Sequence, residues 1–154
     1  MGKHPTDRGK SGTKRSLLTD GHGVPIGLAV DGANRNDCTM ARETIENLAV
    51  KRPEATADAP QGLCLDKGYD YAEVRELLNE FGFTVHIRAR GEEAQALKHE
   101  AGFKGRRWVM ERMHSWMNRF RRVLMRWDKK VHNYLGFLHL AYAYITYRQA
   151  GLLE

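Results

Sequence analysis

The stretch KRSLLTDGHGVPIGLAV, residues 14–30, decides the fold because it contains a strong local folding signal. Two apolar runs flank the pair Asp20-Gly21, and an Asp-Gly pair between such runs is typical of a β-hairpin. Pro25 lies early in the second run and indicates that a strand begins there, because proline is tolerated at the start of a strand. We therefore predict a hairpin over residues 14–30, preceded by a polar arm over residues 1–12.

The residues beyond the hairpin alternate between strand and helix patterns. Short apolar runs predict strands over residues 63–65 and 83–87, the first of them buried. Apolar side chains at helical spacing predict helices after Asp37, after Asp70, over about 107–126 and over about 134–148. Residues 88–105 are polar and contain glycine, which is typical of a loop. The alternation of strands and helices indicates an α/β domain.

Five side chains carry more detailed predictions about these helices. Asp37 is suited to cap the first helix, and Asp70 with Glu73 resembles a capping box at the start of the second. Trp116 and Trp127 are predicted to be core residues of the carboxy-terminal helices.

Length and composition favour one soluble globular domain. The chain has 154 residues, of which 42% are hydrophobic and 29% charged, and this length allows a moderate core. No apolar run approaches the roughly 20 residues that span a bilayer, and residues 1–5 lack the apolar core of a signal peptide. Cys38 and Cys64 form no CxxC pair, which argues against a disulfide scaffold or a zinc–thiolate site. We therefore expect an intracellular protein with no membrane partner.

Positive charge is gathered in two segments of the sequence. The chain has 25 lysines and arginines against 19 aspartates and glutamates, a formal net charge of +6. Residues 104–130 contain ten basic side chains against two acidic ones. The second cluster, near the N-terminus, consists of Arg8, Lys10, Lys14 and Arg15. Two basic patches favour a polyanionic partner, although a solvated helix face would carry the same charges.

Two acidic side chains occur where a metal site for phosphoryl transfer would need them. Asp66 directly follows the strand predicted over residues 63–65, and the carboxyl ends of strands are a usual location for α/β active sites. Glu111 lies at the start of an arginine-rich helix. Carboxylates suit ions of the magnesium class, and two such ions serve phosphodiester chemistry. Two alternatives stay open: a turn role for Asp66, and a role for Glu111 as partner of Arg107 or of the helix dipole.

Six motifs follow one another along the chain. They are PTDRGK (residues 5–10), GTKR (12–15), LTDGHGVP (18–25), GANRND (32–37), DKGYD (66–70) and RWVMERMHSWMNRFRR (107–122). In this order they resemble the DDE-type transposases of bacterial insertion sequences, close to the insertion sequence 5 group. DKGYD matches the motif of the second catalytic aspartate, and the last motif matches the segment that bears the catalytic glutamate. The resemblance covers nearly the whole chain.

The resemblance implies a ribonuclease H-like fold, with Asp66 as the second metal ligand and Glu111 as the third. It implies two Mg²⁺ or Mn²⁺ ions in the complete site, and double-stranded DNA as the partner, both at the element's ends and at the target. The residues that we predict to bind DNA are Arg8, Lys10, Lys14, Arg15, Arg107, Arg112, Asn118, Arg119 and Arg122.

The chain departs from the related family signature on both sides of Glu111. Arg107 fits the arginine that precedes the glutamate, but Lys104 stands where that signature has a tyrosine. Asn118 stands where it has a lysine, so Arg119 or Arg122 is expected to contact the phosphate instead.

A larger departure concerns the first catalytic aspartate, which the family places on a central strand upstream of PTDRGK. Only residues 1–4 precede that motif here, and Asp7 and Asp20 match no catalytic motif. We therefore expect this aspartate and its strand to be absent. Unpaired buried backbone groups cost about 1–3 kcal/mol each, against a total stability of about 5–15 kcal/mol. A marginally folded chain, or direct pairing of the hairpin with the strand at 63–65, is the expected consequence.

Two functions follow for residues 1–154 as a partial catalytic domain. The first is the carboxy-terminal part of a DDE transposase, either joined to an upstream transposase fragment by frameshifting or left as a remnant, and inactive in isolation. The alternative is a non-catalytic DNA-binding or dimerising regulator, for which a homodimer is one form. A ribonuclease H-like nuclease unrelated to transposition is a third interpretation. In each case we expect the protein in the bacterial cytoplasm, at the nucleoid.

Overall fold

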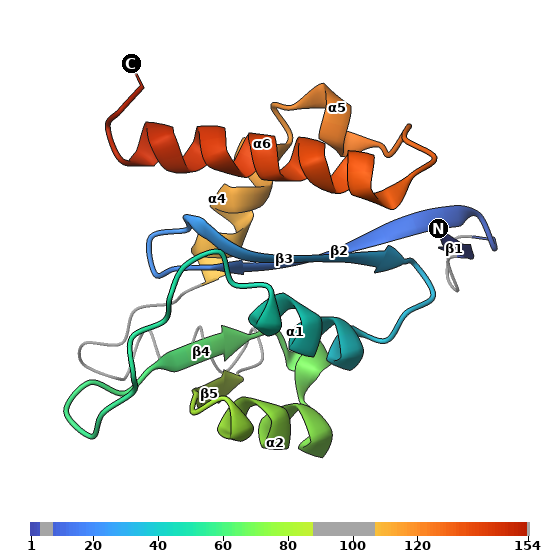
Figure 1. Cartoon of the computed structure of the whole chain (residues 1–154). Coiled ribbons are helices and arrows are strands. Elements are labelled where there is room, and N and C mark those ends of the chain that lie inside the picture. The colour runs from blue at the N-terminus through green and yellow to red at the C-terminus, as the bar shows by residue number, and fades with distance from the viewer. Residues whose placement is uncertain (4–7, 88–106, 154) are drawn as a thin grey trace. The chain divides into compact units, whose positions relative to one another are not determined.

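The computed structural model of this chain describes residues 1–3, 8–87 and 107–153 (Figure 1). The chain divides into two compact units, and each is described here by itself. Met1–Ala49 and Arg107–Glu154 form the first, which we call the hairpin unit, and Val50–Arg106 form the second, the parallel-strand unit. The loop predicted over residues 88–105 lies outside the described residues. Within them, none of the helices combines the length and the apolar character that crossing a membrane requires.

The sheet of the hairpin unit is antiparallel and has the order β1-β2-β3. Its strands are β1 (Gly2–Lys3), β2 (Ser11–Thr19) and β3 (Pro25–Gly32). A hairpin is thus present where the sequence predicts one, with strands that extend past residues 14–30 and with Pro25 at the start of β3. The predicted arm over residues 1–12 differs, because β1 pairs with Ser11 and Gly12 of β2.

The turn of this hairpin is built by the side chain of Asp20. Its Oδ1 accepts hydrogen bonds from the backbone N–H of His22 (2.9 Å) and of Val24 (2.8 Å). The positive φ of the turn, +85°, falls at Gly23 and not at Gly21. The connection is therefore a five-residue loop closed by an aspartate, and not the two-residue Asp-Gly turn that the sequence favours.

Helices cover both faces of the β2–β3 ribbon (Figure 1). Helix α1 (Asp37–Glu46) approaches β3 so closely at Gly27 that a Cβ there would lie 2.7 Å from the Thr44 carbonyl oxygen. The opposite face carries α4 (Arg107–Met117), α5 (Arg121–Leu124) and α6 (Val131–Gln149). The buried core between them consists of Leu28, Val30, Met113, Met117, Val123, Tyr134, Leu138, Ala141, Tyr142 and Ile145.

The cap of α1 lies one residue earlier than predicted. Asn36 is the N-cap, and its side chain accepts a hydrogen bond from Cys38 N at 2.9 Å. Asp37 is instead the first helical residue and forms an ion pair with Lys14, with 2.9 Å between carboxylate oxygen and Nζ. Asparagine and aspartate cap helices almost equally well, so sequence alone does not separate neighbours of these two types.

The single helix predicted over residues 107–126 is broken in two. Helix α4 ends at Met117, and α5 begins at Arg121 after an extended Phe120. The Val123 carbonyl accepts hydrogen bonds from Arg15 Nη1 (3.0 Å) and Tyr134 Oη (2.9 Å). A helix that continued to residue 126 would direct that carbonyl to the backbone four residues later, so tertiary contacts replace the helical ones where α5 ends.

The parallel-strand unit contains β4 (Gly62–Leu65) and β5 (Thr84–Ile87), which pair in parallel with Leu63 opposite Val85. A 3₁₀ turn, η1 (Lys67–Tyr69), leads to helix α2 (Ala72–Glu80). The apolar stripe of α2 is buried, namely Val74, Leu77 and Leu78. In β4 Leu63 is buried but Cys64 is exposed, so this strand has one solvent-facing side, contrary to the prediction of a buried strand.

Two further predictions are wrong in the described residues. The N-cap of α2 is Tyr71, with no side-chain capping bond, because Asp70 binds Lys67 and Arg75 instead of closing a capping box. Trp127 is 68% exposed and not a core residue, whereas Trp116 packs against the core. Each unit has its own sheet in the described part of the chain, with β4 paired to β5 in the parallel-strand unit, and the expected pairing of the hairpin with the strand at 63–65 stays a prediction.

Candidate functional site

Asp66 lies at the carboxyl end of β4, where the chain turns into η1. Its side chain accepts one hydrogen bond from the backbone N–H of Lys67 at 2.8 Å and serves as the cap of η1. The residue is exposed. Both the turn role and an accessible carboxylate at a strand end are therefore present at Asp66, and the first does not exclude the second.

The basic side chains near Asp66 are bound by Asp70. The Asp70 carboxylate accepts hydrogen bonds from Lys67 Nζ at 2.8 Å and from Arg75 at 2.9 Å (Nε) and 2.6 Å (Nη2). The hydrogen bonds from Lys67 first, and from Arg75 second, lower the pKa of Asp70 from its ordinary value. Asp70 thus holds the turn that presents Asp66, and the two aspartates of DKGYD have different local roles.

Glu111 lies in the middle of α4 and is exposed. The helix is fixed by the opposite side, because Val109, Met113 and Met117 are buried there and the two methionines belong to the hairpin unit's core. Arg107 is the first residue of α4. The exposed face of a well-anchored helix is a suitable base for a metal ligand, since the backbone that carries the carboxylate cannot shift easily.

Arg112, next to Glu111, is stacked between two indoles. Its guanidinium carbon lies 4.5 Å from the ring centroid of Trp108 and 4.8 Å from that of Trp116. The Nε is buried and has no hydrogen-bond partner in the described part of the chain. The side chain also meets the hairpin turn, where a Cβ on Gly23 would lie 3.3 Å from Nη2. These contacts make Arg112 a link between α4 and the β2–β3 turn.

Several of the cations predicted to bind DNA have partners inside the protein. Lys14 is paired with Asp37, Arg15 donates to the Val123 carbonyl, and Arg122 pairs with Asp128 at 2.9 Å. The side chains of Arg8, Lys10, Asn118 and Arg119 are exposed. Arg119 forms no ion pair within the residues that the structure describes. Of the two arginines predicted to contact phosphate, Arg122 is thus paired with an acid and Arg119 is not, within the described residues.

His114 lies one turn after Glu111 on α4. Desolvation of the imidazole, and secondarily the charge of Arg15, lower the pKa of His114 from its ordinary value. The neutral form is therefore favoured near pH 7, and His114 adds no positive charge to this face of the helix.

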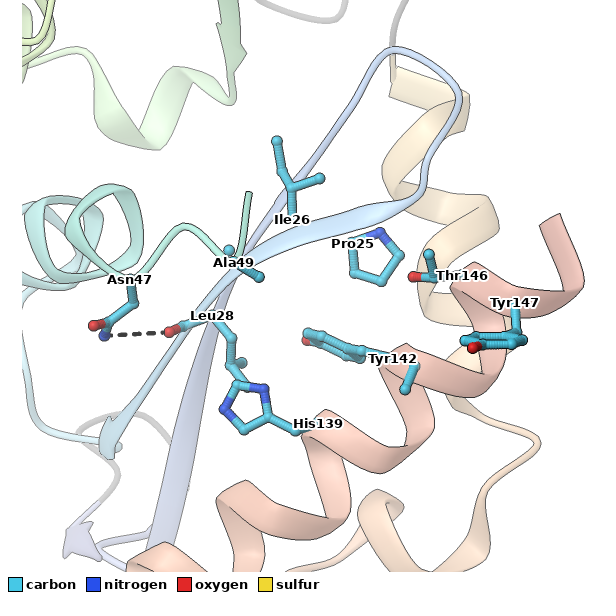
Figure 2. A pocket seen from close by; sticks show the side chains of 11 residues that line it. Pro25, Ile26, Leu28, Asn47, Ala49, His139, Tyr142, Thr146 and Tyr147 are labelled. Carbon is cyan, nitrogen blue, oxygen red and sulfur yellow. Dashed lines mark hydrogen bonds between the residues drawn. The ribbon is translucent and has the colours of Figure 1, made fainter. Parts of the chain in front are cut away.

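A cavity of about 320 Å³ opens elsewhere in the hairpin unit, between β3, the residues after α1, and α6 (Figure 2). Its lining is mostly apolar and includes Pro25, Leu28, Tyr142 and Tyr147. Asn47 Nδ2 donates to the Leu28 carbonyl at its edge, at 3.5 Å. Among the residues that the structure describes, no acidic side chain lines the cavity and offers a carboxylate to a metal ion.

The predicted carboxylates belong to different units, Asp66 to the parallel-strand unit and Glu111 to the hairpin unit. Within residues 1–3, 8–87 and 107–153, no group of three or more His, Cys, Asp or Glu side chains is arranged to hold a metal ion. The donor chemistry of the two residues nevertheless fits Mg²⁺, which prefers carboxylate and water oxygens and takes only one or two protein carboxylates in many sites.

Two features of the hairpin unit were not predicted from the sequence. The stack of Trp108, Arg112 and Trp116 has the spacing i, i+4, i+8, and this spacing on a helix is the signal that would have indicated it. The exposed Trp127 had no such signal, because its position depends on the break between α5 and α6.

Comparison with known proteins places these residues in a family context. The family model described as "Transposase DDE domain" matches residues 2–146. A Burkholderia cepacia protein that bears the name of a transposase for insertion sequence element IS402 is 33% identical over 141 residues. That alignment covers 90% of this chain and 64% of the relative, so the chain spans less than two thirds of the relative's length. No solved structure matches the chain.

Proposed function

Because this chain belongs to the family of transposase DDE domains, we propose that it supplies catalytic and DNA-binding residues to a transposase that cleaves DNA and transfers the cut strand. We assign it to the insertion sequence 5 group on the motifs of residues 5–37, 66–70 and 107–122. The observation that carries the proposal is the match of the family model to residues 2–146, which includes both Asp66 and Glu111.

Asp66 and Glu111 are the proposed metal ligands. Asp66 offers an exposed carboxylate at the end of β4, and Glu111 offers one from the solvent face of α4. Bound Mg²⁺ would supply a nucleophilic oxygen at neutral pH and neutralise charge on the reacting phosphate. The protein's own contribution is to fix the two carboxylates, through the turn held by Asp70 at one and through the buried side of α4 at the other.

The basic face around α4 and α5 is the proposed contact for the phosphate backbone. Arg119 is exposed and makes no ion pair in the described part of the chain, so its charge is available to a phosphate. Arg119→Ala should weaken binding to DNA of any sequence and lower the salt slope by about 0.9, the value for one phosphate contact. Arg122→Ala should act similarly but also break the pair with Asp128. An unchanged slope in both variants would remove this face from the interface.

The proposal is tested by divalent-metal-dependent nicking of supercoiled DNA. We expect the purified chain, given Mg²⁺ or Mn²⁺ together with any fragment needed to complete the site, to nick DNA. Asp66→Asn and Glu111→Gln should each reduce the rate more than about 100-fold. Loss of a residue that only supports a metal ligand already costs up to about 100-fold, and loss of the ligand itself should cost more. Glu76→Gln is the matched control, because Glu76 is an exposed acid on α2 of the parallel-strand unit.

Each outcome of this assay decides between the functions. Nicking by Asp66→Asn at the rate of the unmodified protein would refute the assignment of Asp66. Salt-dependent DNA binding with no metal-dependent nicking under any of these conditions would favour a non-catalytic DNA-binding regulator instead. Loss of nicking in Glu76→Gln as well would indicate that the substitutions act through folding.

A further inference from the structure

The segment between α5 and α6, residues 125–130, presents an indole to solvent. Trp127 is 68% exposed and Met125 is 61% exposed. Tryptophan is highly buried in most proteins, because its ring has one of the largest apolar surfaces among the side chains. The large exposed fraction of Trp127 therefore calls for a functional explanation.

The backbone around Trp127 is held firmly by Arg126. The guanidinium donates to the carbonyl of Asp128 at 2.9 Å, to the carbonyl of Lys129 at 3.0 Å and to Oγ1 of Thr13 on β2 at 3.3 Å. Its carbon also lies 5.9 Å from the ring centroid of Tyr134, which is in the core. The exposure of Trp127 is thus imposed by a structured segment, in which the residues on either side are fixed.

A second set of contacts leaves net positive charge beside the indole. The Asp128 carboxylate is paired with Arg122, and its side chain is only 10% exposed. Arg126 bonds to neutral oxygens and forms no ion pair with an acid within the described ranges of the chain. Arg121, Lys129 and Lys130 are exposed, and none of the three forms an ion pair within the residues that the structure describes.

We propose that Trp127 is a stacking site for an unpaired base of a DNA strand, with Lys129 and Lys130 on the phosphates beside that base. Surfaces that bind single strands combine an aromatic face for the base with cations for the backbone, and the stacking tolerates any sequence because every base has a π face. Bases within a duplex already stack on each other, so Trp127 should add little to duplex binding. This inference rests on the proposed function and adds a single-stranded segment to its substrate.

The test compares binding of a fluorescein-labelled oligothymidine strand with binding of a labelled duplex, both measured by anisotropy. Trp127→Ala should weaken binding of the single strand by about 5- to 140-fold, which corresponds to about 1–3 kcal/mol per stacked base, and change duplex binding less than about twofold. Trp127→Phe should keep most of the affinity, whereas Trp127→Leu should behave like the alanine variant. Met125→Ala is the matched control on the same segment and should bind both probes normally.

The proposed role of Lys129 and Lys130 is tested separately with the same two probes. Substitution of Lys129 and Lys130 together by alanine should lower the salt slope for the single strand by about 1.4, because each phosphate contact on a single strand contributes about 0.7. An unchanged slope would contradict the placement of these lysines on the phosphates beside the base.

Several results would overturn the proposal. Single-strand binding unaffected by Trp127→Ala, equal losses on both probes, or full retention in Trp127→Leu would each exclude base stacking. A change in oligomeric state in Trp127→Ala, seen by size-exclusion chromatography with light scattering, would assign the indole to a protein interface. Circular dichroism should show each variant to be folded before its binding is compared. A failure of the proposed function is distinguishable, because it appears in the unmodified protein as missing duplex binding and missing metal-dependent nicking.

Discussion

The hairpin unit and the parallel-strand unit each carry one proposed metal ligand, but they hold it in different ways. In the hairpin unit, Glu111 lies on a helix whose other side is buried in a core of ten side chains drawn from β3, α4, α5 and α6. In the parallel-strand unit, Asp66 follows a strand of four residues, and the buried apolar side chains among its described residues, 50–87, are Leu63, Val74, Leu77 and Leu78. Packing fixes the first carboxylate, whereas a turn with ion pairs fixes the second.

This difference indicates that different interactions hold the two proposed metal ligands in place. A few buried side chains stabilise a small unit only weakly, because the apolar area that it removes from water is small. We therefore expect the parallel-strand unit to open locally at a lower free energy than the hairpin unit. All three tryptophans belong to the hairpin unit, so their fluorescence reports on that unit alone.

The sharpest test of the comparison truncates one fully buried leucine in each unit. Leu138 in α6 and Leu78 in α2 are both 0% exposed, and replacement of either by alanine should cost about 2–5 kcal/mol. Leu138→Ala should lower the midpoint of urea unfolding seen by tryptophan fluorescence. Leu78→Ala should leave that midpoint nearly unchanged and instead speed hydrogen exchange of the α2 amides. Equal shifts of the fluorescence midpoint in both variants would show that the units unfold as one.

A second test uses one glycine of positive φ in each unit. Gly23 in the hairpin turn has φ +85°, and a Cβ there would lie 3.3 Å from Arg112 Nη2 and 3.4 Å from the Val109 carbonyl oxygen. Gly82 after α2 has φ +72°, but its nearest neighbour, Arg52 Nη2, is 3.7 Å away. The left-handed backbone costs a side chain about 1–2 kcal/mol in either place. Gly23→Ala should cost more than Gly82→Ala, because only Gly23 also has a tight contact. Denaturant unfolding measures both, and the reverse order would contradict the close approach of α4 to the turn.

The predictions from sequence succeeded or failed according to the range of the interactions involved. Residues 14–30 could be predicted as a hairpin because Asp20 and Pro25 act on backbone within a few residues of themselves. The end of α5 at Leu124, short of the helix end predicted near residue 126, could not, since the Val123 carbonyl there accepts from Arg15, which is 108 residues away.

The same distinction between short-range and long-range interactions applies to the candidate site. Asp66 and Glu111 were predicted from motifs that are contiguous in sequence, and both remain predictions. The surroundings of the predicted DNA contacts could not be predicted, because a charge pattern does not reveal which cations the fold itself uses. Lys14, Arg15 and Arg122 are bound to Asp37, Val123 and Asp128 respectively. Sequence patterns thus indicate which residue types are present, while tertiary contacts decide which of them remain accessible.

A third test compares one arginine stacked on aromatic rings in each unit. Arg112 lies between Trp108 and Trp116, whereas Arg52 lies over Phe83 at 4.2 Å and donates to the Phe81 carbonyl. Each stack is worth about 0.5–2 kcal/mol. Arg112→Ala should lower the urea midpoint of the hairpin unit and change tryptophan emission, while Arg52→Ala should do neither.

A conservative variant of Arg112 separates the effect of its charge from the effect of its planar shape. Arg112→Lys keeps the charge but loses the planar guanidinium that stacks on both indoles, so it should recover only part of the lost stability. Arg119→Ala, on the exposed surface of the same region, is the control and should stay within about 0.5 kcal/mol of the unmodified protein. Full recovery by lysine would indicate that charge alone, and not stacking, links α4 to the hairpin turn.

The smallest expected effect is on pH dependence, and it too differs between the units. In the hairpin unit the folded-state pKa of His114 lies below its ordinary value of 6.5, chiefly through desolvation. The unfolded chain therefore binds the proton more readily, and the free energy of unfolding falls as the pH drops below about 6.5. In the parallel-strand unit the pKa of Asp70 lies below 3.8, chiefly through the hydrogen bond from Lys67. Its contribution is present above pH 3.8 and is lost as the pH falls through the folded-state pKa.

Acid should therefore weaken the hairpin unit first and remove the support of the Asp66 turn only later. Urea unfolding followed by tryptophan fluorescence from pH 7.5 to 5 should show the decline, and His114→Gln should flatten it. The protection factors of the α2 amides, which are corrected for the pH dependence of intrinsic exchange, should change little over that range and fall only below about pH 4, with Asp70→Asn removing the acid step. An identical pH profile for His114→Gln and the unmodified protein would show that other groups, and not this helix, set the acid sensitivity of the unit that carries Glu111.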